Sequence, residues 1–177
     1  MCGIVGYVGK ENAASILIDG LSKLEYRGYD SAGIAVLDDS QENKEIEVIK
    51  AKGRLQALRE MTDNGRAVKG CCGIGHTRWA THGEPSVVNA HPHVSKDRKI
   101  AVVHNGIIEN YKEIKEYLQK KGYEFLSETD TEVIAHLLDY YYKGNPLEAI
   151  TKVLGRVRGS YALGILFQEN PGVMYAV

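Results

Sequence analysis

The sequence is poor in cysteine and shows no excess of charge of either sign. Its cysteines are Cys2, Cys71 and Cys72, and because adjacent cysteines rarely reach disulfide geometry, no disulfide framework is implied. The 22 lysines and arginines offset 23 aspartates and glutamates, and no basic block could neutralise a run of phosphates. We therefore expect a protein of a reducing, cytoplasmic compartment that does not bind nucleic acid.

Long apolar runs are also missing. The apolar start at 2–8 is too short for a signal peptide, and no later segment is long enough to span a membrane. With four prolines, no repeat and no low-complexity tract, nothing in the chain marks a linker. Because 177 residues with 44% hydrophobic content can bury one core of ordinary size, we expect a single domain over 1–177.

The periodicity of apolar residues predicts an α+β fold. Helices come in pairs between groups of strands, which favours layered packing over a doubly wound parallel sheet, and a long polar loop covers 78–98. The chain stops while still apolar, so we expect a domain that is incomplete at its C-terminus. Strands are expected at 2–8, 31–37, 45–49, 71–77, 99–104, 160–167 and 173–177, and helices at 12–24, 54–61, 109–121, 130–142 and from 145 onward.

Two of the expected helix starts carry capping signals. Asn145 followed by Pro146 is typical of a cap with proline at the first helical position. Thr129 and Glu132 have the spacing of a capping box, in which each side chain bonds the backbone of the other residue. We therefore expect helices to begin directly after Asn145 and Thr129.

Cys2 directly follows the initiator methionine, and its small side chain permits removal of Met1. The processed chain would carry a thiol and a free α-amine on one residue. An α-amine titrates at about 7.7–8.0 and a thiol at about 8.5, so the amine can take the thiol proton near neutral pH. Cys2 is therefore a candidate nucleophile, although a small buried residue that opens a strand would look the same.

Five motifs occur in order along the chain: CGIVG (2–6), YRGYDSAG (26–33), HTRWATHGEPS (76–86), HNGIIEN (104–110) and SETDTEVI (127–134). In this order they resemble the class II glutamine amidotransferases, and the resemblance extends from Cys2 to at least Ile134. Within that class, RWATHG (78–83) and NAHPH (89–93) are similar to the members that make glucosamine 6-phosphate from fructose 6-phosphate.

The resemblance implies an N-terminal-nucleophile hydrolase fold, a four-layer αββα sandwich of two antiparallel sheets. It also implies hydrolysis of L-glutamine to glutamate and ammonia through a γ-glutamyl thioester on Cys2, without a cofactor. In longer family members the ammonia passes to a sugar-phosphate isomerase domain that binds fructose 6-phosphate, and we expect that domain to lie outside this sequence. The parent enzymes are expected to be homo-oligomers, whereas this chain alone could be a monomer.

Arg78 and Asp130 match the family motifs and suit recognition of a free amino acid. A buried amino acid needs its carboxylate and its ammonium paired, because an unpaired buried charge is costly. Arg78 can grip the α-carboxylate with its planar fork, while Asp130 can accept from the α-ammonium. An ordinary surface arginine and a helix-capping aspartate are the alternative interpretations.

Asn105 and Gly106 are expected to form the oxyanion hole. Attack on the side-chain amide of glutamine creates a negative oxygen that needs preorganised donors, and this pair offers an amide N–H and a backbone N–H at the end of a strand. Taken alone, Asn-Gly is also a common turn signal.

Further residues join the expected site through the resemblance. Trp79, Thr81 and His82 would lie on a loop that closes over bound glutamine and excludes water. Arg27 and Gly28 would lie beside Cys2.

A metal site is not expected. The remaining histidines and the paired cysteines follow no zinc-binding spacing, so packing in the core or in loops is the simpler interpretation. These residues are His76, His91, His93, His104, His136, Cys71 and Cys72.

Two other functions stay open. Another member of the N-terminal-cysteine class would share the nucleophile and be either a different amidotransferase or a hydrolase of a non-glutamine amide, although Arg78 together with Asp130 argues for a free amino acid. A regulatory domain that keeps the fold without the activity would be expected if Met1 is retained.

Overall fold

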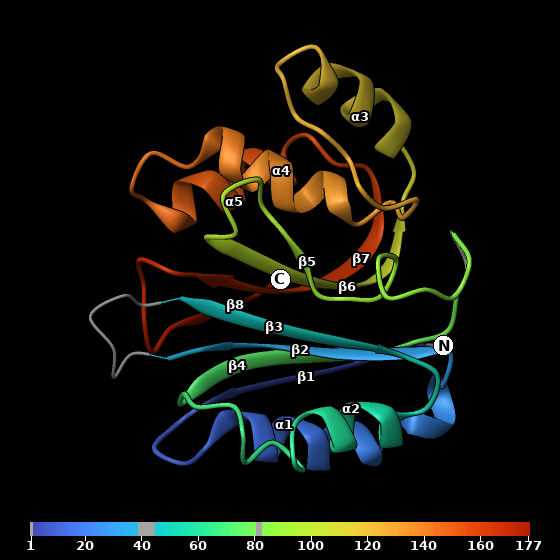
Figure 1. Cartoon of the computed structure of the whole chain (residues 1–177). Helices are drawn as coiled ribbons and strands as arrows, with labels where there is room; N and C mark the ends of the chain where they lie inside the picture. Colours follow the sequence, from blue (N-terminus) through green and yellow to red (C-terminus); the bar gives the residue numbers. More distant parts are fainter. Residues whose placement is uncertain (1, 39–44, 81–82) are drawn as a thin grey trace.

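The computed structural model describes residues 2–38, 45–80 and 83–177. Two four-stranded antiparallel sheets lie face to face, and helices cover the outer face of each, so the molecule has four layers (Figure 1). The first sheet has the order β1-β4-β2-β3, formed by β1 (Gly3–Val8), β4 (Cys72–Arg78), β2 (Ser31–Leu37) and β3 (Ile46–Lys52). The second has the order β5-β6-β7-β8, formed by β5 (His93–Val94), β6 (Ile100–Ile108), β7 (Gly159–Phe167) and β8 (Met174–Ala176).

Helices α1 (Ala13–Ser22) and α2 (Leu55–Met61) cover the outer face of the first sheet (Figure 1). The α1 helix begins at Asn12, whose side chain accepts a hydrogen bond from Ser15 N at 2.9 Å, which satisfies a backbone donor of the first turn. Leu17 and Leu21 point from the helix into a fully buried cluster against the sheet. A short 3-10 turn, η1 (Glu25–Arg27), then leads the chain into β2.

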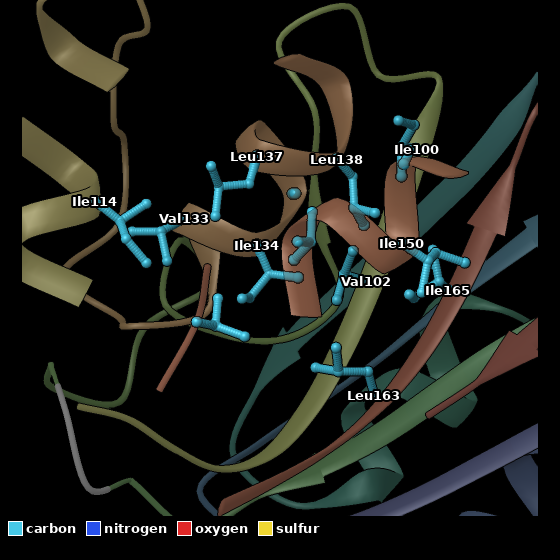
Figure 2. Packing of buried hydrophobic residues seen from close by; sticks show 14 of the residues in the cluster. Ile100, Val102, Ile114, Val133, Ile134, Leu137, Leu138, Ile150, Leu163 and Ile165 are labelled. Atoms are coloured by element: carbon cyan, nitrogen blue, oxygen red, sulfur yellow. The ribbon is translucent and has the colours of Figure 1, made fainter. Parts of the chain in front are cut away.

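Helices α4 (Glu132–Tyr141) and α5 (Pro146–Leu154) cover the second sheet, and α3 (Tyr111–Gln119) packs against α4. Figure 2 shows Ile134, Leu137 and Leu138 of α4 packed with Val102 of β6 and Ile150 of α5. All of these side chains are buried, so α4 is apolar on most of its surface and forms the centre of this layer.

A third apolar cluster fills the space between the two sheets. Ala35 and Ile74 of the first sheet belong to the same buried cluster as Ala101, Val103 and Leu166 of the second. Several of these side chains are small, so the two backbones approach closely. This packing sets the position of β6 relative to β1 and β4, and therefore the geometry of the site described below.

The prediction of an α+β sandwich with two antiparallel sheets is confirmed, and most of the expected elements agree with the structure within a few residues. Two details were wrong. The polar loop expected at 78–98 contains the short strand β5. Strand β6 continues past the expected end at residue 104 to Ile108, because Asn105 and Gly106 pair with Ala162 and Tyr161 of β7.

One of the two predicted caps is also wrong. Asn145 caps α5 as expected, since its side chain accepts from Glu148 N at 3.2 Å. The capping box at Thr129 does not form, because α4 begins after Thr131 without a side-chain cap. The Glu132 carboxylate accepts instead from Leu126 N at 3.0 Å and from Ser127 N at 2.7 Å, and so holds the preceding loop.

In the ranges that the structure describes, no helix is long and apolar enough to cross a membrane.

Candidate active site

The antiparallel pairing of β1 with β4 places Cys2 beside the end of β4. Gly3 is opposite Thr77 in this register, so Cys2, one residue earlier, comes next to Arg78 and Trp79. Trp79 N donates to Cys2 Sγ at 3.3 Å, and Sγ lies 3.6 Å from Trp79 O. The sulfur is therefore held against a single peptide segment.

The backbone around Trp79 is held in turn by Gly28 and Asp30. A Cβ atom at Gly28 would lie 2.7 Å from the carbonyl carbon of Arg78, so only glycine fits there. Asp30 N donates to Arg78 O at 3.2 Å, and the Asp30 carboxylate accepts from Ala80 N. The prediction that Gly28 lies near the nucleophile thus has a physical reason, while Arg27 ends η1 and does not line the pocket that contains Cys2.

Arg78 is nearly fully buried, with 3% of its surface exposed, which argues against an ordinary surface arginine. Its Nη2 donates to Gly83 O at 3.0 Å and its Nη1 lies 3.4 Å from Glu84 O. Because a guanidinium carries five N–H donors in a rigid plane, these contacts fix its orientation.

Asp130 is buried just before α4 and is tied to the second sheet. Its Oδ2 accepts from Ile108 N of β6 at 2.8 Å, and its Oδ1 lies 4.0 Å from His104 Nδ1. Since Asp130 does not cap the helix, the alternative interpretation as a capping residue is wrong.

Asn105 reaches across from the second sheet to the nucleophile. Its Nδ2 donates to Cys2 O at 3.3 Å, and its Oδ1 lies 2.9 Å from His76 Nε2. The same Nε2 lies 3.0 Å from His104 O, which can only accept. His76 must therefore carry its proton on Nε2, so the Asn105 oxygen faces His76 and the NH₂ group faces Cys2.

Gly106 follows Asn105 inside β6, and its backbone conformation requires glycine. Its φ of 122° lies in a region that side chains disfavour, and a Cβ atom would meet Ser160 O at 2.1 Å. The alternative interpretation of Asn105-Gly106 as a turn is wrong, because both residues lie within the strand.

One pocket of about 30 Å³ brings together half of the predicted site residues. Residues up to 129 positions apart in sequence, from Cys2 to Thr131, line it. Asn105 does not line it but contacts the Cys2 backbone, and Thr81 and His82 lie outside the described residues. The predicted residues on the pocket wall are Cys2, Arg78, Trp79, Gly106 and Asp130.

Four further residues of the pocket wall have no role predicted from the sequence. Thr131 Oγ1 lies 2.9 Å from His91 Nε2 and 2.8 Å from His104 Nδ1, so one hydroxyl orients two imidazoles. Their position next to predicted site residues could have indicated two of them, because Thr131 follows Asp130 and His104 precedes Asn105 in the same motifs. The residues concerned are His91, His104, Thr129 and Thr131.

The histidines near the pocket form a buried layer of neutral rings. The rings of His76 and His91 stack with centroids 4.1 Å apart, and His93 lies edge-on to His91 at 4.8 Å. Burial lowers the pKa of His76 to about 4 and that of His93 to about 3, and it holds the pKa of His91 well below its usual range. Over the described parts of the chain, no three histidine, cysteine or carboxylate side chains converge as metal ligands would.

Solved structures with the same fold come from amidotransferases. The glutamine phosphoribosylpyrophosphate amidotransferase from B. subtilis superposes with a TM-score of 0.80 at 29% identity, over 95% of this chain and 35% of that chain. The allosteric regulatory enzyme of purine biosynthesis gives a TM-score of 0.79 at 31% identity, over 95% of this chain and 36% of that chain. The fold is therefore that of the amidotransferases with an N-terminal-nucleophile hydrolase fold.

The sequence narrows this class further. Residues 76–177 match the glutamine amidotransferase domain, and the chain belongs to that family. It is 59% identical to the glutamine–fructose-6-phosphate aminotransferase (isomerizing) of Caldanaerobacter subterraneus subsp. tengcongensis, and 59% identical to that of Clostridium acetobutylicum. The alignments cover 99% and 100% of this chain but 28% of each relative, so the chain spans little more than a quarter of their length.

The neutral histidine layer predicts that acid destabilises the fold. In the unfolded chain these rings titrate near 6.5, whereas burial lowers the folded pKa values of His76 and His93 to about 4 and about 3. Below pH 6.5 the unfolded state therefore binds protons that the folded state does not. Each ring then lowers the free energy of unfolding by about 1.4 kcal/mol per pH unit. Urea unfolding at pH 7, 6 and 5 should show a falling midpoint.

His93→Gln is the informative variant for this prediction, because it removes one titrating ring. Its unfolding free energy should change less steeply between pH 6.5 and 5 than that of the wild type. A wild-type midpoint that does not move over this interval would contradict the prediction.

Proposed function

We propose that the chain hydrolyses L-glutamine to glutamate and ammonia with Cys2 as the nucleophile. The observation that carries the proposal is the single pocket on which Cys2, Arg78, Gly106 and Asp130 meet. A thiol, a guanidinium fork, a carboxylate and an exposed backbone N–H are the groups that this reaction needs. Membership of the glutamine amidotransferase domain family supports the same substrate.

The reaction would begin with transfer of the Cys2 thiol proton to the α-amine of the same residue, once Met1 is removed. The sulfur attacks the side-chain amide carbon of glutamine, and the C–N bond then breaks as the protonated amine returns a proton to the departing ammonia. The product is a γ-glutamyl thioester. Water, deprotonated by the same amine, hydrolyses this thioester and releases glutamate.

Asn105 and Gly106 would stabilise the negative oxygen formed in each of the two steps. Because His76 fixes the amide so that Nδ2 faces Cys2, the donor is oriented before substrate arrives. Preorganisation matters here, since a donor that had to rotate would lose much of its electrostatic benefit. We therefore assign Asn105 and Gly106 to the oxyanion hole and His76 to the positioning of Asn105.

Arg78 and Asp130 would pair with the α-carboxylate and the α-ammonium of glutamine. Both side chains are buried and face the same pocket as Cys2, so their charges would be strongest there in the absence of water. Glutamine does not fit a volume of about 30 Å³, which is close to the share of one water molecule in the liquid. Binding of glutamine would therefore require the pocket to widen, and Trp79 is a half-exposed part of its wall.

In a longer parent, the ammonia would serve the conversion of fructose 6-phosphate to glucosamine 6-phosphate. This proposal is supported by the activity for which the relatives are named, glutamine–fructose-6-phosphate aminotransferase, and by their greater length. A homo-oligomeric parent and a cytoplasmic location stay predictions.

The first test concerns the nucleophile and its base. Cys2→Ala should abolish glutaminase activity and keep the fold, because it removes the thiol without opening much core space. A chain that retains Met1 should be equally inactive, although every side chain is intact. Ammonia release and intact mass measure both. Full activity with Met1 in place would show that the base lies elsewhere, and an active Cys2→Ala variant would refute the mechanism.

The second test concerns the oxyanion. Asn105→Ala should lower kcat by roughly 10²–10³ with a smaller change in KM, because the lost donor acts mainly in the transition state. His76→Leu should reproduce part of the loss in kcat, since it frees the Asn105 amide to rotate. If Asn105→Ala changed KM alone, Asn105 would instead belong to ground-state binding.

The third test concerns substrate choice. Arg78→Lys keeps the charge but loses the bidentate fork, so kcat/KM for glutamine should fall on the order of 10²-fold, as expected for a desolvated charged contact. The preference for glutamine over its des-carboxy analogue, 4-aminobutanamide, should shrink in parallel. Arg66→Lys, on the exposed surface, is the matched control. An unchanged preference in the Arg78 variant would favour a general amide hydrolase.

A further inference from the structure

A second, much larger cavity lies apart from the pocket at Cys2. Its volume is about 670 Å³, within the range typical of sites for small molecules, and it shares no lining residue with the pocket at Cys2. It opens between β3, the segment from Val87 to Arg98 and the start of α4. The mechanism proposed above uses none of its residues, so the cavity needs a separate explanation.

The walls of this cavity are largely hydrocarbon. Val87 and Val88 are each 50% exposed, and Leu126 is 81% exposed, which places three apolar side chains in contact with solvent around one hollow. Single exposed apolar residues need no explanation, but a group around a concave surface is typical of a binding site. These walls would favour a ligand with a carbon skeleton over a bare inorganic ion.

The charged groups around the cavity are three cations and the carboxylates of Glu124 and Glu132. Lys50, Lys96 and Arg98 line it, and within the described residues none of the three forms an ion pair with a carboxylate. Lys50 Nζ instead donates to Val88 O at 3.2 Å and to Ala90 O at 2.8 Å, so its third N–H is available to a ligand. Burial lowers the pKa of Lys50 to about 8, so an anion beside it would relieve an unfavourable charge.

The floor of the cavity carries a polar group without a partner. His136 is 97% buried, lines the cavity and lies beside the rings of Tyr123 and Phe125. Its Nδ1 has no hydrogen-bond partner among the described residues. Buried polar atoms in native proteins nearly always have a partner, so a polar group of a ligand is a natural complement.

Glu132, one turn before His136, places a negative charge close to Lys50 and His136. Its carboxylate already accepts from Leu126 N, Ser127 N and Ser127 Oγ. Burial alone would raise the pKa of Glu132, but these hydrogen bonds and His136 lower it to about 2. The ionised carboxylate therefore serves to fix the 126–127 wall of the cavity.

We propose that this cavity is a second ligand site, which binds a small organic anion, a phosphate or carboxylate on an apolar skeleton. Lys50 and Arg98 would bind the anionic group, Val88 and Leu126 would cover the skeleton, and His136 Nδ1 would pair with a polar substituent. This site is independent of the proposed glutaminase reaction.

The test is a titration followed by ¹⁵N–¹H NMR on the whole chain, with phenyl phosphate and benzoate as probes and phenol as the uncharged analogue. We expect saturable shifts at the amides of Val94, Lys96, Arg98 and Ser127 with at least one anion, and roughly tenfold weaker binding of phenol. The stronger of the two anions identifies phosphate or carboxylate as the preferred group.

Charge variants decide whether the cavity itself is responsible. Arg98→Gln should raise the Kd of the better anion roughly tenfold, and it breaks no hydrogen bond described here. Lys50→Gln should do the same, while Lys69→Gln, which removes an exposed charge outside the cavity, should have no effect. Absence of saturable shifts, equal binding of phenol, or an Arg98→Gln variant with unchanged affinity would overturn the proposal. So would shifts confined to the surroundings of Cys2.

Discussion

The candidate site depends on the pairing of β1 with β4, which holds Cys2 against the Arg78–Trp79 peptide. The sulfur has two contacts there, to Trp79 N and Trp79 O, and both come from backbone. Gly28 packs against this peptide and Asp30 N donates to it, so the atoms that contact the sulfur are backbone atoms held by further backbone contacts. Asn105 of the second sheet lies at the same point. The close packing of Ala35, Ile74 and their partners between the sheets fixes the distance between Asn105 and Cys2.

The electrostatics of the site follow from burial. A layer of imidazoles lies behind the pocket, and charged rings there would repel Arg78 and compete with it for an anionic group. Burial holds the pKa of His76 and of His91 well below neutrality, so the layer supplies hydrogen bonds without charge. A neutral His76 with its proton on Nε2 is also what orients Asn105. Burial of the histidines therefore both keeps the layer behind the pocket uncharged and fixes the direction of the Asn105 amide.

The sequence was most informative where one residue type is required by local chemistry. Asn145-Pro146 is such a case, because this cap depends only on neighbouring residues. It was least informative where distant segments decide the outcome. Asn105-Gly106 lies inside a strand because β7 pairs with it, and Glu132 leaves its capping role because Leu126 and Ser127 offer better donors.

The buried histidines show the same limit. His76, His91 and His104 were interpreted as packing residues, since their spacing in sequence predicts no shared role. Thr131 connects His91 and His104, while the packing of β6 against β4 brings Asn105 to His76, and both relations arise from the tertiary fold. A pattern of single residues carries little information about such a network.

The pocket at Cys2 and the larger cavity are neighbours because the chain alternates between them. His91 lines the pocket while His93 lines the cavity, and Thr129 of the pocket wall contacts His93 Nε2 at 3.1 Å. Along the next segment, Asp130 faces the pocket and Glu132 faces the cavity. Residues two positions apart in the chain therefore line different hollows, which is why neighbouring residues of one motif can belong to unrelated sites.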